Sequence, residues 1–146
     1  MAVHPALIEA AEKDLARAHA MMTGWSLAPA ARIGGNAAPG MWMSGGTMAL
    51  LGRGRPGVLA RDLAACNAWT SASDAARRVT CPTTVIMGEL DLMTPPRKAR
   101  DLVGAIAGAK AVTIAGAGHM TMLEAPDATL DALLAAFSPK RQAGAA

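Results

Sequence analysis

An aspartate and a histidine each follow a short apolar run of the sequence, and together they could transfer protons. Asp91 comes shortly after the run at 83–87, and His119 comes shortly after the run at 111–115. A carboxylate that holds a histidine ring in one tautomer, and stabilises its imidazolium form, allows general-base catalysis at neutral pH. Asp91 and His119 are therefore our candidate catalytic residues.

The two apolar runs predict strands that would bring this pair together. Both runs are short and rich in β-branched residues, and Pro82 and Gly88 bound the first, which is typical of buried strands. Each strand should be followed by a helix, and the order strand–helix–strand–helix favours a parallel sheet covered by helices. Because the carboxyl ends of parallel strands meet at one edge, Asp91 and His119 are expected on neighbouring loops.

The helices expected on this sheet begin at prolines. Thr94 is expected to cap the first helix, with Pro95 and Pro96 at its first positions, and the second helix should begin near Pro126. We expect each helix to bury an apolar face. These faces are Ala99, Leu102, Val103 and Ile106 in the first helix, and Leu130, Leu133, Leu134 and Phe137 in the second.

Residues 1–79 are expected to be almost wholly helical. The expected elements are a helix over 5–23, loops over 24–57 with a short helix possible near 47–51, a helix over 56–69 and a short helix over 73–78. None of them supplies a strand, and two strands do not form a stable sheet alone. Either the chain dimerises or further strands belong with it.

The stretch from Cys81 to Phe137 closely resembles the C-terminal segment of α/β-hydrolases. Its two patterns are Cys-Pro-Thr-strand-Gly-Glu-x-Asp-x-x-Thr-Pro-Pro and strand-x-Gly-x-Gly-His-x-x-x-Leu-Glu-x-Pro. In that family the first pattern carries the acid of a catalytic triad and the second carries the histidine, in this order along the chain. The resemblance implies these roles for Asp91 and His119.

The same resemblance implies the fold class, which is α/β. Residues of this chain would form the C-terminal part of an α/β-hydrolase parallel sheet with flanking helices, preceded by a helical cap region. The interpretation divides the chain into a cap or lid-like region over 1–79, a C-terminal core segment over 80–138 and a disordered tail over 139–146.

The nucleophile of the triad is the part of the pattern that the sequence lacks. The resemblance implies a serine in a Gly-x-Ser-x-Gly turn between a strand and a helix. Ser26 lies in Gly-Trp-Ser-Leu-Ala, which matches only in part and follows a helical pattern, and Ser44 fits no better. We therefore expect the chain to hold the acid and the histidine but no nucleophile. Glu89 and Glu124 also match family positions, and we interpret them as partners of loop backbone.

Tryptophans and methionines are the candidate substrate-binding residues, namely Trp25, Trp42, Met43 and Met120. Those of the helical region could line an apolar pocket or could form the core of that region, and the sequence leaves both open. In the first case the substrate is small and largely apolar. An ester is the first choice, although the fold also supports other hydrolytic reactions. The alternative function is a catalytically inactive half-hydrolase that acts as a binding module or a subunit.

Composition excludes several other functions. The 146 residues are 52% hydrophobic with a net charge of +3, and they contain one Phe, three Trp and no Tyr. Scattered basic residues without interleaved aromatics do not predict nucleic-acid binding. No apolar run approaches the ~20 residues that span a membrane. The first residues do not resemble a signal peptide, so a cytoplasmic protein is expected.

We expect no cofactor and no metal. Cys66 and Cys81 lack the spacing of a metal site, and we interpret them as two buried or half-buried thiols. The expected partners are an apolar small-molecule substrate and either a second copy of the chain or a missing N-terminal half.

Overall fold

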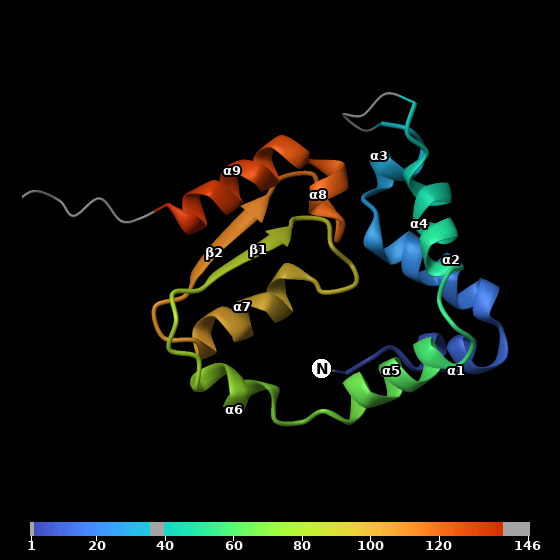
Figure 1. The fold of residues 1–146 in the computed structure, drawn as a ribbon, viewed down its shortest axis with the longest axis horizontal. Coiled ribbons are helices and arrows are strands. Elements are labelled where there is room, and N and C mark those ends of the chain that lie inside the picture. The colour runs from blue at the N-terminus through green and yellow to red at the C-terminus, as the bar shows by residue number, and fades with distance from the viewer. Residues whose placement is uncertain (1, 36–39, 139–146) are drawn as a thin grey trace, which may run out of the picture.

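The computed structural model describes residues 2–35 and 40–138, which form a set of helices and a two-stranded sheet (Figure 1). The predicted tail over 139–146 lies outside the described residues. We call residues 2–79 the helical part and residues 80–138 the strand part, while the predicted roles of these parts as cap and core stay predictions. In chain order the elements are α1 (Pro5–Lys13), α2 (Leu15–Ser26), α3 (Pro29–Arg32), α4 (Met43–Leu51), α5 (Val58–Ala68), α6 (Ala72–Arg77), β1 (Thr84–Gly88), α7 (Pro96–Ala105), β2 (Lys110–Ile114), α8 (Thr121–Glu124) and α9 (Pro126–Phe137).

The single helix predicted over 5–23 is wrong, because Asp14 divides it. The backbone of Asp14 leaves the helical conformation (φ −149°, ψ 81°), and its side chain accepts a hydrogen bond from the N–H of Arg17 at 3.0 Å. Asp14 therefore ends α1 and caps α2. The break lets α1 and α2 pack on each other around buried Leu7 and Ala18, and Leu63 of α5 packs against this core.

Helices replace much of the loop predicted over 24–57. α2 continues to Ser26, α3 begins at Pro29, and α4 is longer than the short helix predicted near 47–51. This region contributes buried apolar residues to a cluster that also receives side chains from the strand part. The cluster consists of Leu27, Ala31 and Met43, with Met120 and Leu123 packed against it. It therefore joins the two parts of the molecule.

β1 and β2 form the predicted parallel pair. Val85 lies opposite Ala111 and Gly88 lies opposite Ile114 in the register, and the predicted bounds are confirmed to within one residue. α7 and α9 lie on opposite sides of the strand pair and contact both strands (Figure 1). The loops that follow the two strands therefore meet at one edge of the sheet, as predicted.

The burial predicted for the strand part is wrong for much of α9. This helix buries its small residues Thr129 and Ala132, whereas the larger face that was expected inside is exposed. The large side chains of α9 are exposed because a sheet of two strands is too narrow to cover the whole apolar face of the helix. β2 is likewise largely exposed except at Ile114. The exposed fractions are 54% for Leu130, 41% for Leu133, 58% for Leu134 and 83% for Phe137, with 43% for Leu102 of α7.

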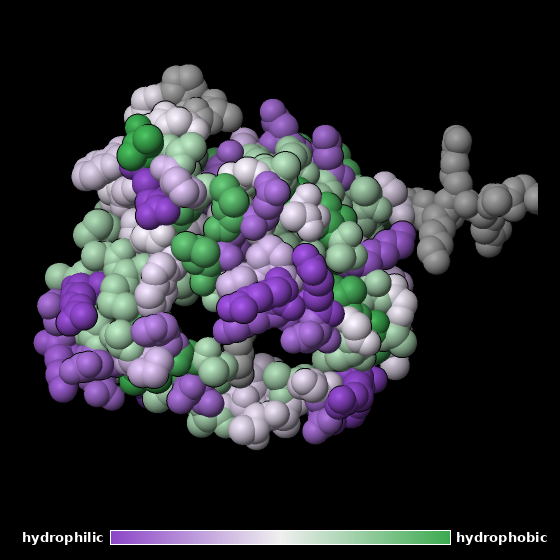
Figure 2. All heavy atoms as spheres, turned by 180° about the vertical axis from the view of Figure 1, so that it is seen from behind, coloured by the Kyte–Doolittle hydropathy of each residue, from purple (hydrophilic) through white to green (hydrophobic). Residues whose placement is uncertain are grey.

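The molecule is hollowed between its helical part and its strand part. Figure 2 shows open gaps near the centre of one face, and most of the buried apolar residues of the described chain lie in three separate clusters. Cys66 and Cys81 are exposed free thiols, so their predicted burial is also wrong. None of the described helices is long and apolar enough to cross a membrane.

Two glycines, Gly88 and Gly118, pack backbone to backbone where the strands end. A Cβ atom on Gly88 would overlap the carbonyl group of Gly118, and backbone atoms cannot rotate aside as a side chain can. Gly104 in α7 offers a contrast, because a Cβ atom there would meet nothing within 4 Å. The two sites provide a matched pair of substitutions.

We predict that Gly88→Ala lowers the free energy of unfolding by about 2 kcal/mol or more, because it forces the two loops apart. Gly104→Ala should raise it by about 0.5 kcal/mol, because alanine restricts the unfolded chain and suits a helix. Urea unfolding followed by circular dichroism measures both. A Gly88→Ala chain as stable as the unmodified chain would contradict the close packing of the loops.

Candidate active site

Asp91 lies after β1 in a turn that its own side chain stabilises. Its Oδ1 atom accepts hydrogen bonds from the N–H groups of Met93 at 2.7 Å and of Thr94 at 2.9 Å. The residue is only 5% exposed, so these donors replace water around the buried carboxylate. The N–H of Leu90 donates to the carbonyl of Ala117 at 2.8 Å, which ties this acid loop to the loop after β2.

The loop after β2 brings His119 to the same carboxylate. Nδ1 of His119 lies 2.9 Å from Oδ2 of Asp91. Since an ionised carboxylate can only accept, Nδ1 carries a proton, and in the neutral ring Nε2 then has the lone pair. Among the hydrogen bonds of the described residues, those of the His119 ring involve Nδ1 and leave Nε2 without a partner. The pair therefore has the arrangement of an oriented general base.

Two opposing effects act on the charge of Asp91. Burial raises the pKa of its carboxyl group, while hydrogen bonds from His119 and Thr94 lower it by more, so the pKa lies below its ordinary value of 3.8. Asp91 is consequently a carboxylate at neutral pH. A charged acceptor beside Nδ1 fixes the tautomer of His119.

The last carbonyl groups of α2 hold both loops. The final turn of a helix leaves carbonyls without partners inside the helix. Here the carbonyl of Trp25 accepts from the N–H of Leu92 at 3.2 Å, and the carbonyl of Ser26 accepts from the N–H of His119 at 2.6 Å. Gly118 permits this approach, because a Cβ there would lie 2.5 Å from the oxygen of Ser26. The negative end of α2 thus lies beside the histidine loop, which favours a positive charge there.

Glu124 completes this junction from the histidine loop. Its carboxylate accepts hydrogen bonds from the N–H groups of Ala28 at 2.8 Å and of Met120 at 3.2 Å. Glu89 accepts one from the N–H of Gly116 at 2.8 Å. The predicted role of both glutamates as partners of loop backbone is confirmed.

The four predicted substrate-binding residues lie in different surroundings. Met43 is buried and Met120 is half-buried in the cluster that joins the two parts. The side chain of Trp25 packs on the core of α1 and α2, and Trp42 is 72% exposed before α4. Met43 and Met120 belong to the same cluster, and Met120 directly follows His119 in the chain, whereas neither tryptophan is part of that cluster. The role of all four in substrate binding stays a prediction.

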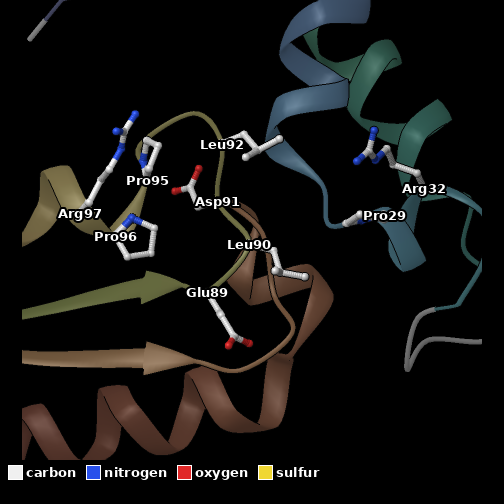
Figure 3. Close-up of a pocket in the computed structure, with 9 residues that line it drawn as sticks. All are labelled: Pro29, Arg32, Glu89, Leu90, Asp91, Leu92, Pro95, Pro96 and Arg97. Carbon is white, nitrogen blue, oxygen red and sulfur yellow. The ribbon is translucent and has the colours of Figure 1, made fainter.

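An open depression of about 440 Å³ lies between the acid loop and α3 (Figure 3). Pro29 and Arg32 line it from the helical part, and residues 89–92 and 95–97 line it from the strand part. Glu89 points away from Asp91 in this view. His119 is not among the lining residues, so the depression adjoins the acid and not the free nitrogen of the histidine.

Thr94 is the residue of this site that the sequence did not reveal. Its predicted role as the cap of α7 is wrong, because Pro95 is the N-cap residue and no side chain caps the helix. Its hydroxyl instead lies 2.7 Å from Oδ2 of Asp91. The spacing Asp-x-x-Thr held the signal, since an aspartate side chain often bonds groups two and three residues further on. Within the described ranges no group of three or more His, Cys, Asp or Glu residues is placed to bind a metal.

Comparison with known proteins supports one family. The family model described as Alpha/beta hydrolase family matches residues 2–132. An esterase from Exiguobacterium antarcticum superposes with a TM-score of 0.74 at 18% identity, covering 89% of this chain and 45% of that chain. A hydrolase from Pseudomonas aeruginosa has a TM-score of 0.74 at 26% identity, covering 94% and 52%. An enzyme that degrades N-acyl homoserine lactones has a TM-score of 0.73 at 23% identity, covering 93% and 52%.

This chain therefore spans about half the length of the solved structures that it matches. None of the curated protein sequences matches it significantly. The likeness to the structures at 18% and 23% identity concerns the fold alone.

We predict that Glu124→Gln loosens the junction between α2 and the histidine loop. An amide has one acceptor oxygen, so one of the two N–H donors would face an NH₂ group and lose its partner. The free energy of unfolding should fall by about 1–3 kcal/mol, and the amides of Ala28 and Met120 should exchange faster with solvent. Glu89→Gln is the matched control and should cost less, since that side chain is exposed. Unchanged exchange at Ala28 in Glu124→Gln would contradict the role of this carboxylate.

The lowered pKa of Asp91 predicts a specific acid sensitivity. Because the folded pKa lies below the unfolded one, the stabilisation is fully present above about pH 4 and is lost as pH falls through the folded value. Asp91→Asn removes this contribution, so its urea midpoint should fall less steeply below pH 4 than that of the unmodified chain. Parallel curves for the two chains would show that Asp91 is not stabilised as a carboxylate.

Proposed function

Because the chain belongs to the α/β-hydrolase family, we propose that it contributes the acid and the histidine to the hydrolysis of a small, largely apolar substrate. The predicted family and the α/β fold class are confirmed. The observation that carries the proposal is the 2.9 Å hydrogen bond between buried Asp91 and His119, at the carboxyl edge of two parallel strands. An ester is the first choice of substrate, and esterases among the similar structures support it.

In the proposed reaction a serine hydroxyl attacks the substrate carbonyl. Nε2 of His119 takes the proton of that hydroxyl, returns it to the leaving group and then activates water. Asp91 keeps the ring oriented and stabilises the imidazolium that forms. The end of α2 supports the same charge through the hydrogen bond between Ser26 and the backbone of His119.

We place the nucleophile outside the described residues. Ser26 is buried and its carbonyl already holds the histidine loop, while the hydroxyl of Ser44 faces the carbonyl of Arg32 at 3.4 Å. Neither hydroxyl is hydrogen-bonded to His119 among the described contacts. The serine would come with further strands that pair with the free edge of β1, either in the same polypeptide or in a partner chain. The central hollow and the exposed face of α9 support this placement (Figure 2).

The apolar side of the site would be formed around the histidine loop. Met120 directly follows His119 and is half-buried beside Met43, so it is the predicted substrate-binding residue with the best support. This apolar cluster and the family support a small, largely apolar ester as the substrate. The alternative is a catalytically inactive half-hydrolase that acts as a binding module or a subunit, and the experiment below distinguishes the two functions.

We predict that the 146-residue chain alone hydrolyses p-nitrophenyl acetate and butyrate no faster than its His119→Ala variant. The coding sequence around the chain should contain a strand followed by Gly-x-Ser-x-Gly, and the polypeptide that includes it should be active. In that polypeptide His119→Ala should lower kcat by about 10³-fold or more. His19→Ala, in the middle of α2, is the matched control and should keep the activity, because the His19 side chain makes no hydrogen bond to the site loops among the described contacts.

Two outcomes would contradict this proposal. Activity of the 146-residue chain that His119→Ala abolishes would mean that a serine within it, Ser26 or Ser44, is the nucleophile. Absence of both the Gly-x-Ser-x-Gly sequence and any esterase activity would favour the binding module or subunit.

A further inference from the structure

The hydroxyl of Thr94 lies between the two side chains of the candidate pair. Its Oγ1 atom is 2.7 Å from Oδ2 of Asp91 and 3.2 Å from Nδ1 of His119. Both distances are within hydrogen-bond range, and the shorter one is typical of an O–H donor to a charged oxygen. Thr94 is therefore in contact with both members of the pair.

We propose that Thr94 is a positioning residue of the acid–histidine pair, whose hydroxyl holds Oδ2 of Asp91 against Nδ1 of His119. The proposal deepens the proposed function and rests on it for its catalytic meaning. The contacts that it describes are all made within this chain, so they can be tested without measuring hydrolysis.

The numbers of donors and acceptors leave one consistent arrangement. The carboxylate of Asp91 only accepts, so the single hydroxyl proton of Thr94 points to Oδ2. The N–H group at Nδ1 of His119 then donates both to Oδ2 of Asp91 and to the hydroxyl oxygen of Thr94. If the proton were on Nε2 instead, Nδ1 would face two lone pairs. Thr94 thus reinforces the tautomer that leaves Nε2 free to act as a base.

One residue fixes both oxygens of the carboxylate. The backbone N–H of Thr94 donates to Oδ1 of Asp91 at 2.9 Å, and the hydroxyl of Thr94 donates to Oδ2. Rotation of the carboxylate about its Cβ–Cγ bond would break both contacts at once. Thr94 itself is well anchored, since its β-branched side chain is restricted and Pro95 and Pro96 fix the backbone that follows. The carboxylate would therefore keep its orientation even while His119 is protonated or moves.

The test is the titration of the Asp91 carboxyl group, followed by ¹³C nuclear magnetic resonance in the 146-residue chain. Thr94→Val keeps the shape and removes the hydroxyl, so the midpoint for Asp91 should rise by about 0.5–1 pH unit, which is the size of one lost hydrogen bond. Thr94→Ser restores the hydroxyl and should return the midpoint to within about 0.2 pH unit. Thr83→Val is the matched control, since that hydroxyl bonds the carbonyl of Cys81 away from the pair.

An Asp91 midpoint that is unchanged in a folded Thr94→Val chain would overturn the proposal. So would a rise that Thr94→Ser does not reverse, because it would show an effect of packing alone. If Thr94→Val does not fold, the hydroxyl proton of Thr94 in the unmodified chain decides. A slowly exchanging proton with a nuclear Overhauser contact to the His119 ring supports the proposal, and a fast-exchanging one overturns it.

Activity provides a separate readout. In the active polypeptide, Thr94→Val should lower kcat about tenfold with KM unchanged, and Thr94→Ser should restore most of it. If no active polypeptide exists, the proposed function fails while the titration result for Thr94 still stands. If hydrolysis is normal in Thr94→Val, the proposed function stands and the positioning role fails.

Discussion

The structure depends on the last carbonyl groups of α2, which have no partner within the helix and must find one outside it. Every helix must satisfy its last carbonyls, and α2 uses the N–H groups of Leu92 and His119 to do so. These two donors belong to the two loops that carry the candidate pair. The helical part is therefore joined to the strand part at the place where the chemistry would occur. A displacement of α2 would act on both loops at once.

The pair does not hold its own loops together. A main-chain hydrogen bond from Glu89 to Ile114 joins the acid loop to the end of β2, and one from Leu90 to Ala117 joins it to the histidine loop. The contact between Gly88 and Gly118 sets the separation of the two loops. The side chains of the pair consequently meet in a geometry that the backbone has already fixed. Such preorganisation is what makes a charged group effective in catalysis, because little reorganisation is needed when charge develops.

Much of the strand part could be predicted from the sequence because its signals are local. A short β-branched run, a glycine-containing loop and a proline at a helix start each depend on a few neighbouring residues. The burial of α9 could not be predicted in this way, since the exposure of Phe137 depends on the width of a sheet elsewhere in the chain. The break at Asp14 depends on a single cap within a continuous helical period. Thr94 was missed because a hydroxyl before a helix suits both a cap and a nearby carboxylate, and the local spacing Asp-x-x-Thr fits the second role without excluding the first.

The burial of Asp91 fits the proposed catalytic role better than the alternative role in binding an apolar ligand. A buried carboxylate costs free energy unless several donors surround it, and a site that only had to bind an apolar molecule would gain from an apolar residue there. This chain surrounds Asp91 with donors from Met93, Thr94 and His119, yet leaves the side chain of His119 41% exposed. Water screens a charge at such a histidine and competes for Nε2. The strands that we propose to pair with β1 would cover this side chain as well as the exposed face of α9. These strands would thus both complete the sheet and exclude water from the reaction.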